Sequence, residues 1–477
     1  MVKDKHSLLL GVVYTRRDLE GEFFCNSGVA LKRKAMIEAK IKQMGVEHTN
    51  IDFLNEEGII RNGLDAEKVA SEFNALGVDA LFCPHLNFGT EDAIAKLGKL
   101  MKRPLMIWGL RDDAPDAQGN RSTDSQCGLF ATGKVLQQFK VPFSYMTSCT
   151  LNDPVFERVL NNFISCSQVV KSFRGLRIGQ IGVRPETFWS VKANELQLLE
   201  RFGIEIVPIT MIEMQNLYNE TLATGEKELS NLVKYYKETF SAAIADEYLL
   251  RTAALNRTIR KWADENEIDG IASSCWGAMR QIGGISSCFT FSELTDEKLP
   301  VVCETDIHGA ITSVMAQAAT RWQKSSFLAD ITIRHPTNDN AELLWHCGVF
   351  PKSTASKAEK PAIGFSFDEH RPSVANFLLD EGIITISRFD CAGDKYQLLL
   401  CEGKSVPGPK TTGTYGWFEF KDWPKLEHKV VCGPYIHHCV GIYERVSPVL
   451  FEACKYIPGI EADPVDPTAE ELEAYLR

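Results

Sequence analysis

The sequence predicts an α/β protein that ends in a β-rich region. Over the first two thirds of the chain, short apolar runs alternate with segments of helical apolar spacing, which is typical of a parallel sheet covered on both faces. After residue 350 the pattern changes to β-type runs separated by Gly, Pro and Asp turns, which favours a small antiparallel barrel or sandwich. The length of 477 residues fits about three domains.

Residues 1–172 and 173–350 are expected to form two α/β domains. The first has predicted strands at 8–14, 80–83, 104–108 and 141–145, and predicted helices at 29–44, 91–102 and 133–139. The second has predicted strands at 174–182, 204–208 and 270–273, a helix ending near 202 and two helices across 213–266.

A polar segment at 351–361 predicts an exposed linker into a third, β-rich domain at 351–477. The strands expected there cover residues 363–367, 382–388, 396–400, 416–420 and 429–431. Residues 467–477 have the composition of a short acidic helix.

Charge and composition exclude several classes of function. The formal net charge is −11 and no Lys/Arg-rich block occurs, so nucleic acid and anionic membranes are poor partners. No apolar run reaches the roughly 20 residues that span a bilayer, and we expect no signal peptide. The 14 cysteines form no Cys-x-x-Cys pair, which indicates reduced thiols in a cytoplasmic protein. Without a Gly-x-Gly-x-x-Gly after the first strand or a Walker loop, a nucleotide cofactor has no support.

Two acids stand beside apolar runs. Glu304 follows a strand-like run, and Asp330 interrupts an alternating strand pattern. A buried carboxylate needs a partner, because leaving it unpaired costs several kcal/mol or protonates it. The alternative role for Glu304 is to cap the following helix. Asp306 and His308 are further candidates for that capping role. Asp330 has the alternative of an ion pair with Arg334 or another base.

Three histidines lie at strand-like runs: the pair His437 and His438, and His346. Adjacent residues of a regular strand face opposite ways, so we expect at most one of the pair to bind a metal from such a strand. The other would contact substrate or belong to the core, and His346 has the same alternative of a core residue. Carboxylate and imidazole ligands without cysteine favour Mn²⁺, Mg²⁺ or Co²⁺. A cation held in this way has open coordination positions for two neighbouring oxygens of a substrate. It can polarise a carbonyl beside a hydroxyl while a carboxylate transfers a proton.

The pattern around these residues resembles the L-fucose/L-arabinose isomerase superfamily on its fucose isomerase-like side. The matching segments are Cys275-Trp276, Ser287-Cys288, 294–296, 302–310, 327–330, 344–348 and 434–438. One departure lies after Trp276, where many relatives have Pro-Glu and this chain has Gly277-Ala278. A carboxylate that relatives offer to substrate is therefore missing.

The resemblance implies two Rossmann-like parallel-sheet domains followed by a β-rich, barrel-like C-terminal domain. It also implies Mn²⁺ and the interconversion of an aldose and its ketose, in a homo-oligomer that is often a hexamer with sites near subunit interfaces. On this interpretation Glu304 and Asp330 are the catalytic acids and act through a cis-enediol, and they hold the cation with His438 or His437. The residues expected to contact the sugar are His346, Trp276, Arg16 and Arg17, and His346 has the alternative of a metal ligand.

Some alternatives stay open at this level. Arg16 and Arg17 have the alternative of a solvated surface pair. A sugar-binding sensor without catalysis and a metal-dependent aldolase are the competing functions. Fucose, arabinose, another pentose or deoxyhexose, and an acidic sugar such as sulfoquinovose are all compatible substrates.

Overall fold

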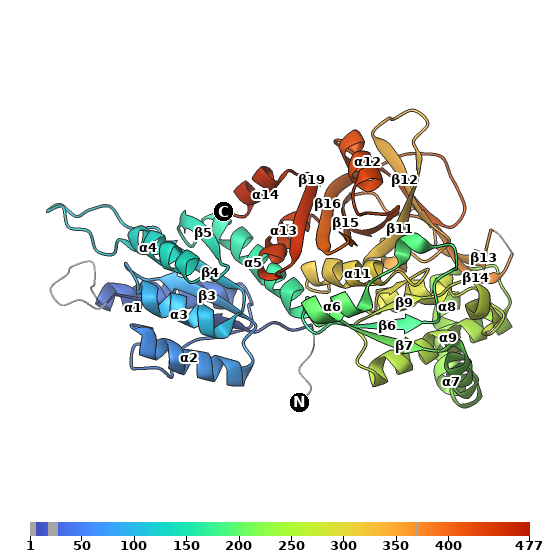
Figure 1. The fold of residues 1–477 in the computed structure, drawn as a ribbon, viewed down its shortest axis with the longest axis horizontal. Coiled ribbons are helices and arrows are strands. Elements are labelled where there is room, and N and C mark those ends of the chain that lie inside the picture. Colours follow the sequence, from blue (N-terminus) through green and yellow to red (C-terminus); the bar gives the residue numbers. More distant parts are fainter. Residues whose placement is uncertain (1–5, 18–26, 368–369) are drawn as a thin grey trace. The chain divides into compact units, whose positions relative to one another are not determined.

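The first sheet is parallel and has the strand order β2-β1-β3-β4-β5. A computed structural model describes residues 6–17, 27–367 and 370–477. The central strands β3 and β4 are buried along their whole length, as expected for a sheet covered on both faces (Figure 1). The strands are β1 (Leu10–Val12), β2 (His48–Thr49), β3 (Ala80–His85), β4 (Leu105–Leu110) and β5 (Ser144–Cys149). The helices are α1 (Ser27–Gln43), α2 (Gly63–Leu76), α3 (Glu91–Met101), α4 (Ser125–Gln138) and α5 (Pro154–Phe173).

The second sheet is also parallel, with the order β10-β9-β6-β7. Its strands are β6 (Arg177–Ile181), β7 (Glu205–Ile209), β9 (Gly270–Ser273) and β10 (Val301–Val302). The helices of this region are α6 (Glu195–Phe202), α7 (Met211–Thr224), α8 (Glu226–Thr239), α9 (Asp246–Glu265), α10 (Cys288–Asp296) and α11 (Ile307–Ala319), with short 3-10 turns η2 (Trp189–Val191) and η3 (Gly277–Gln281).

The third sheet closes on itself. Pairing between β16 and β17 joins the two ends of the order β16-β15-β18-β11-β12-β17, so these strands form a barrel-like ring. The strands of this sheet are β8 (Ser241–Ala242), β11 (Phe327–Arg334), β12 (Ala341–His346), β13 (Ala362–Phe365), β14 (Pro372–Leu378), β15 (Ile383–Ala392), β16 (Lys395–Val406), β17 (Thr414–Phe420), β18 (His438–Ile442) and β19 (Ile460–Asp466). The remaining elements are η4 (Lys352–Thr354), α12 (Trp423–Cys432), α13 (Ser447–Tyr456) and α14 (Ala469–Tyr475). The predicted class, parallel α/β followed by a β-rich barrel, is confirmed.

Two local predictions are wrong. The strand expected at 429–431 is part of helix α12, because the Asp422 side chain caps that helix at Lys425 N–H (3.1 Å) and Pro424 favours its first turn. The segment 213–266 holds three helices instead of two. Gly225 separates α7 from α8, and β8 separates α8 from α9 by pairing with β13.

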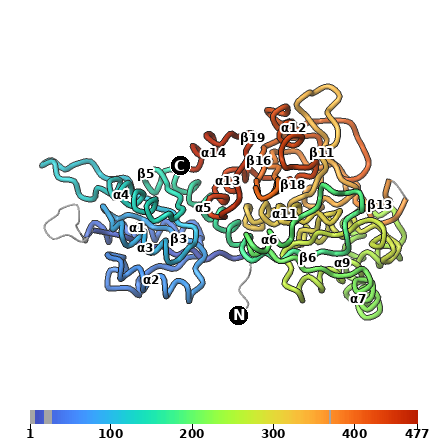
Figure 2. The backbone as a smooth tube through the Cα atoms, in the orientation of Figure 1, coloured from blue at the N-terminus to red at the C-terminus, as the bar shows by residue number. Residues whose placement is uncertain are grey.

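The chain divides into two compact units. One comprises Met1–Lys171, Lys455–Pro458 and Glu470–Arg477, and the other Ser172–Cys454 and Gly459–Ala469. In the second unit one apolar core runs from the parallel sheet into the barrel, with Ile181 and Phe418 among its members. Helix α11 packs against both β15 and β18 of that barrel, and Figure 2 labels α11 and β18 in this region. The division at residue 350 into separate domains stays a prediction.

Within the described residues, no helix is both long and apolar enough to cross a bilayer.

Candidate metal centre

The turn between β10 and α11 presents Glu304. Glu304 and Thr305 both take left-handed backbone conformations, with φ of 65° and 57°, and such conformations cost a non-glycine residue on the order of 1 kcal/mol. The turn leaves Asp306 as the N-cap of α11, where its carboxylate accepts a hydrogen bond from Gly309 N–H (3.0 Å). Asp306 therefore supplies the cap that was the alternative role for Glu304.

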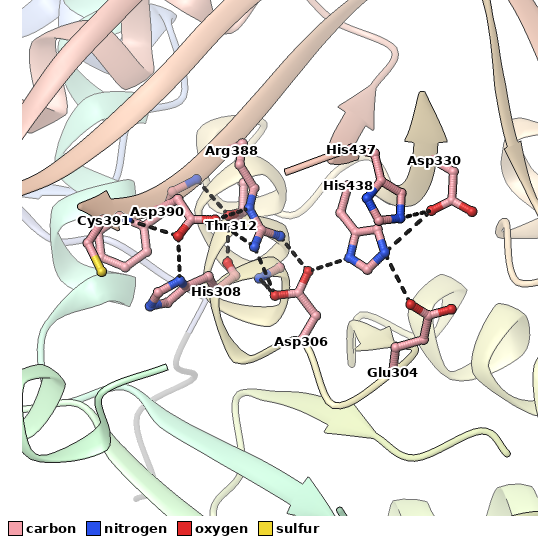
Figure 3. A network of polar contacts seen from close by, with 12 residues as sticks. Glu304, Asp306, His308, Thr312, Asp330, Arg388, Asp390, Cys391, His437 and His438 are labelled. Atoms are coloured by element: carbon pink, nitrogen blue, oxygen red, sulfur yellow. Dashed lines mark hydrogen bonds and ion pairs between the residues drawn. The ribbon is translucent and has the colours of Figure 1, made fainter. Parts of the chain in front are cut away.

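Asp330 and His438 face each other across two antiparallel strands. Asp330 of β11 pairs with His438, the first residue of β18. His437 precedes that strand, so strand alternation does not separate the two imidazoles, whose ring centroids lie 4.4 Å apart. Both Nε2 atoms approach Asp330 Oδ1, at 3.4 Å from His438 and 3.8 Å from His437 (Figure 3). Arg334 instead approaches Asp339 and Glu342, so the Arg334 pairing considered for Asp330 is not formed.

Glu304 completes a group of converging donor atoms. Its Oε2 lies 3.2 Å from His438 Nε2. Among the described residues, neither His438 Nε2 nor Asp330 Oδ1 has a hydrogen-bond partner, although both atoms are buried. Neighbouring donors around a cation with bonds of about 2.1 Å lie about 3.0 Å apart. Asp330, His437 and His438 offer donor atoms that all lie within 4.8 Å of one another, and Glu304 adjoins this group through His438. Carboxylate and imidazole donors in this arrangement fit a divalent cation.

A buried ion-pair network orients His438 (Figure 3). His438 Nδ1 donates to Asp306 Oδ2 (2.9 Å), which leaves the Nε2 lone pair directed at Glu304 and Asp330. Two guanidinium N–H groups of the fully buried Arg388 hold the same carboxylate. Asp306 thus caps α11, pairs with Arg388 and fixes the protonated ring nitrogen of His438.

The network continues on the far side of Arg388. Its Nε donates to Asp390 Oδ2 (2.9 Å), and His308 Nδ1 lies 3.0 Å from Asp390 Oδ1. Two carboxylates, each with one histidine, thus flank one buried guanidinium. Arg388 and Asp390 were not predicted from the sequence as site residues. The available signal was their spacing, because two charged residues two positions apart in an apolar strand share one face and need partners if that face is buried.

Electrostatics keep both carboxylates of the network ionised. Burial raises the pKa of Asp306, but Arg388 and the hydrogen bond from His438 hold that pKa far below its ordinary value. Burial likewise raises the pKa of Asp390, and Arg388 and His308 lower it overall. For His438, burial lowers the pKa, while the Asp306 and Glu304 carboxylates raise it to about 9. The carboxylates around His438 therefore favour positive charge at its Nε2, either as a proton or as a metal cation that replaces the proton.

Glu304, Asp330 and His437 line a cavity of about 240 Å³, named the Glu304 pocket. The other lining residues are aromatic, thiol, hydroxyl and cationic side chains: Phe188, Cys275, Trp276, Arg280, Ser286, Cys288, Trp345, His346, Cys347, Ser366 and Phe367. Trp276 is 43% exposed and packs edge-on against Phe188, with ring centroids 5.3 Å apart.

His346 presents a hydrogen-bond donor to this pocket. Its Nδ1 accepts a hydrogen bond from Cys347 N–H (2.9 Å), so the proton of the neutral ring belongs on Nε2. That Nε2 is buried and has no hydrogen-bond partner among the described residues. The structure thus brings His346 and Trp276 into the same pocket as Glu304 and Asp330.

Arg16 and Arg17 lie in the other compact unit. Arg16 is buried and makes a two-point contact with Glu57, from Nε (2.8 Å) and Nη2 (3.2 Å). Arg17 pairs with Glu91 at 3.0 Å, and its guanidinium stacks 3.9 Å from the centroid of the Phe88 ring. Both follow β1, at the point where the sheet order reverses and where open α/β folds bind ligands. Their contact with a sugar stays a prediction.

Comparisons with known proteins point to one family. Residues 11–174 match the model of the fucose/sulfoquinovose isomerase N-terminal domain. A sulfoquinovose isomerase of Priestia aryabhattai is 25% identical over 334 residues, which cover 69% of this chain and 72% of that protein. The sulfoquinovose isomerase of Alkalicoccus urumqiensis is also 25% identical, over 70% of this chain and 73% of its own length.

A solute-binding protein of Actinobacillus succinogenes with bound D-allose is 11% identical and covers 66% of this chain and 92% of its own, but with a TM-score of 0.16. That likeness carries no weight for fold or function. The N-terminal family model and the relatives support a place for this chain in the fucose isomerase-like superfamily.

Proposed function

We propose that this protein is a metal-dependent aldose–ketose isomerase, an intramolecular oxidoreductase that works in the Glu304 pocket. The isomerase class agrees with its relatives, which are named sulfoquinovose isomerases. One observation supports the metal dependence most directly. Glu304 Oε2 and Asp330 Oδ1 lie 3.2 Å and 3.4 Å from His438 Nε2, and within the described chain this nitrogen and Asp330 Oδ1 are buried without hydrogen bonds.

Glu304, Asp330 and His438 would hold Mn²⁺, with Mg²⁺ or Co²⁺ as alternative ions. His437 is half-exposed and is the additional donor. When bound, the cation supplies positive charge beside the carbonyl and hydroxyl oxygens of the open-chain sugar. Asp306 and Arg388 keep the His438 ring in the orientation that this binding requires.

Glu304 and Asp330 also move the protons. The two carboxylates flank the C1–C2 unit of the sugar, and one removes the C2 proton while the other transfers the hydroxyl proton. The product of these transfers is a cis-enediol, and return of a proton to C1 gives the ketose. His346 Nε2–H and the Trp276 ring orient the sugar from the pocket wall.

The sugar is an open-chain aldose, and a sulfonated aldose is the first to test because the relatives are named for sulfoquinovose. Arg280, a cationic residue of the pocket wall, supports an anionic group on the substrate. The other sugars to be tested are L-fucose, arabinose, other pentoses and other deoxyhexoses.

The assembly we propose is a homo-oligomer, with the hexamer favoured, in which Arg17 reaches the site of a neighbouring subunit. Arg17 suits this role better than Arg16, because the side chain of Arg17 is 27% exposed and that of Arg16 only 5%. Light scattering with chromatography measures the assembly, and a monomer at working concentration rules it out. The cytoplasmic location expected from the sequence stays a prediction.

The test is turnover of each sugar with Mn²⁺ present, compared with metal-stripped protein. Ketose formation with solvent deuterium entering C1 supports the enediol route. Cleavage into two shorter products instead identifies an aldolase, and sugar binding without turnover identifies a sensor. Mn²⁺ binding is measured separately by calorimetry, so that a wrong sugar and a missing metal are distinguishable.

Two amide variants test the proton-transfer roles. Gln and Asn keep the size and one oxygen donor of Glu304 and Asp330, but neither amide acts as a base near neutral pH. With Mn²⁺ in excess, Glu304→Gln and Asp330→Asn should stay folded and lose at least about 100-fold in turnover. A metal-loaded double variant that keeps the wild-type rate would falsify the enediol assignment.

A further inference from the structure

Four thiols gather at one side of the Glu304 pocket. Cys275 follows β9, Cys288 opens α10, Cys303 follows β10, and Cys347 follows β12, so four separate segments contribute. Cys347 lies at the centre. Its Sγ is 3.4 Å from Cys288 Sγ, and it also hydrogen-bonds with Cys303, which in turn contacts Cys275. The mechanism proposed above uses none of these sulfurs.

Thiols of this cluster line a cavity. Cys288 and Cys347 line the Glu304 pocket, whereas Cys83 and Cys166 are fully buried core residues. The pocket holds about 240 Å³, and a water molecule occupies about 30 Å³ of liquid. The cavity therefore has room for a molecule as small as hydrogen peroxide beside both sulfurs.

We propose that Cys347 and Cys288 form an oxidisable dithiol in the pocket wall, modified by peroxide. Hydrogen-bond donation from the Cys288 and Cys303 thiols favours the thiolate of Cys347, which is the nucleophilic form. Cys288 is the proposed resolving thiol, because it lines the pocket together with Cys347 and its sulfur lies 3.4 Å from that of Cys347. Its sulfur needs to move about 1.4 Å closer to reach the disulfide bond length of about 2.05 Å.

The reaction balances with hydrogen peroxide as the oxidant. The Cys347 thiolate attacks one peroxide oxygen, the O–O bond breaks, and a sulfenic acid and hydroxide form. The Cys288 thiol then attacks the sulfenic sulfur, and the S–O bond breaks with release of water. The two sulfurs lose two electrons in total, and one peroxide is reduced to two waters. The proton of the Cys288 thiol leaves with the sulfenic hydroxyl group, and the hydroxide takes up the proton that Cys347 released when it ionised. A dithiol reductant reverses the change.

The disulfide would alter the pocket because both cysteines stand beside functional groups. Cys347 directly follows His346 and donates its backbone N–H to that ring. Drawing Cys347 toward α10 therefore displaces His346. Displacements of about 1 Å at a reacting centre cost up to about 100-fold in rate, so we expect turnover to fall by about 10–100-fold. This consequence rests on the proposed isomerase function, whereas the disulfide itself does not.

The test treats reduced, metal-loaded protein with hydrogen peroxide and then alkylates the remaining thiols. Peptide mass spectrometry under non-reducing conditions should show a Cys288–Cys347 cross-link, and dithiothreitol should remove it. Turnover, if an isomerase substrate has been found, should fall at the rate of cross-linking and recover with the reductant. Absence of turnover in untreated protein would count against the proposed function only, because the cross-link is measured without substrate.

Three variants make the assignment specific. Cys347→Ser should give no cross-link, and Cys288→Ser should pass to an irreversible sulfinic acid at Cys347. Cys454→Ser is the matched control, because Cys454 is buried outside the cluster. The serine hydroxyl can donate the hydrogen bond that Cys454 Sγ makes to Leu450 O. This variant should give the same cross-link as the wild type. Circular dichroism checks that each variant folds. If Cys347→Ser does not fold, Cys347→Ala is used in its place.

Three outcomes overturn the proposal. The first is a cross-link between Cys347 and Cys303 in place of Cys288. The second is oxidation confined to the exposed Cys127 and Cys432. The third is a cross-link that persists in Cys347→Ser. A Cys288–Cys347 cross-link that leaves turnover unchanged overturns the predicted effect on the sugar pocket.

Discussion

Asp306 shows how one buried residue sets the chemistry of another. It occupies the N-cap of α11, accepts the Nδ1 proton of His438 and is neutralised by Arg388. Carboxylates placed behind a metal-binding histidine typically set its tautomer and orientation. His438 depends on this support because the other polar groups near its Nε2 are the carboxylates of Glu304 and Asp330.

The first prediction concerns Asp306→Asn. The amide keeps the shape of the cap but removes the charge that favours the Nδ1 proton, so Mn²⁺ affinity should fall by about 10–100-fold. Isothermal calorimetry measures this affinity. Asp390→Asn is the control, because Asp390 contacts the same Arg388 but not His438, and the loss there should be clearly smaller. Equal Mn²⁺ affinities in Asp306→Asn and wild type would show that Asp306 does not orient His438 for metal binding.

A second residue-scale prediction concerns the pH dependence of stability. Glu293 in α10 is 3% exposed. Burial, followed by the nearby Asp296, raises its pKa from 4.5 to about 8. Between these two values the folded state keeps a proton that the unfolded state has lost, so the free energy of unfolding falls as pH rises through this window. Above pH 8 the cost of ionised Glu293 is on the order of 4–5 kcal/mol.

Glu293→Gln removes that titration. The variant should therefore lose less stability than the wild type between pH 5 and 8.5, and it should be the more stable protein at the upper value. Urea unfolding at both pH values measures the difference. The exposed Glu265→Gln serves as the control and should follow the wild type. Parallel pH profiles for Glu293→Gln and wild type would contradict the buried protonated carboxyl.

At the scale of elements, the pairing of β11 with β18 assembles the centre. The register that sets Asp330 opposite His438 also sets Phe327 opposite Gly441. A Cβ on Gly441 would lie 2.2 Å from the Phe327 ring. The absence of a side chain at Gly441 thus leaves the space that the Phe327 ring occupies.

Gly441→Ala should destabilise the barrel and loosen the register. Overpacking of this kind costs about 1–3 kcal/mol, measured as the midpoint shift in urea unfolding. Adding Phe327→Leu should restore part of the loss, since the two positions contact each other and couple by about 0.5–3 kcal/mol. Additive effects of the two changes would mean that the ring and the glycine do not constrain each other.

At the scale of the whole molecule, all candidate metal donors lie in one compact unit. Glu304, Asp330 and His438 belong to the unit of Ser172–Cys454 and Gly459–Ala469. A ligand that binds only the folded state stabilises it by about 2.7 kcal/mol at 100 times its dissociation constant. That stabilisation should be local to the unit that holds the ion.

Hydrogen exchange with mass spectrometry checks this expectation. Adding Mn²⁺ to metal-stripped protein should increase protection in peptides from β11, β18 and the first turn of α11. Peptides from β3 and β4 of the other unit should exchange at unchanged rates. Protection that rises equally in both units would show that the donors do not lie in one unit alone.

The sequence predicted well wherever the determinant is local. The alternation of apolar runs gave the parallel sheets, and the acids and imidazoles beside them identified the residues that the structure brings together around His438. Local patterns failed at 429–431, where strand propensity is overridden by the cap at Asp422 and Pro424. They also left Glu304 and Asp306 as alternative caps, and the left-handed turn at 304–305 resolves that question.

The sequence by itself determined the fold class and which residue types carry the chemistry, because periodicity and the cost of burying charge act over short stretches of chain. Only the tertiary structure decided which groups meet. Asp306 and His438 are 132 positions apart, and Arg388 is 82 positions from Asp306. Their contacts depend on strand register within the barrel and on the docking of α11 against β15 and β18, and register is fixed by packing of the whole sheet.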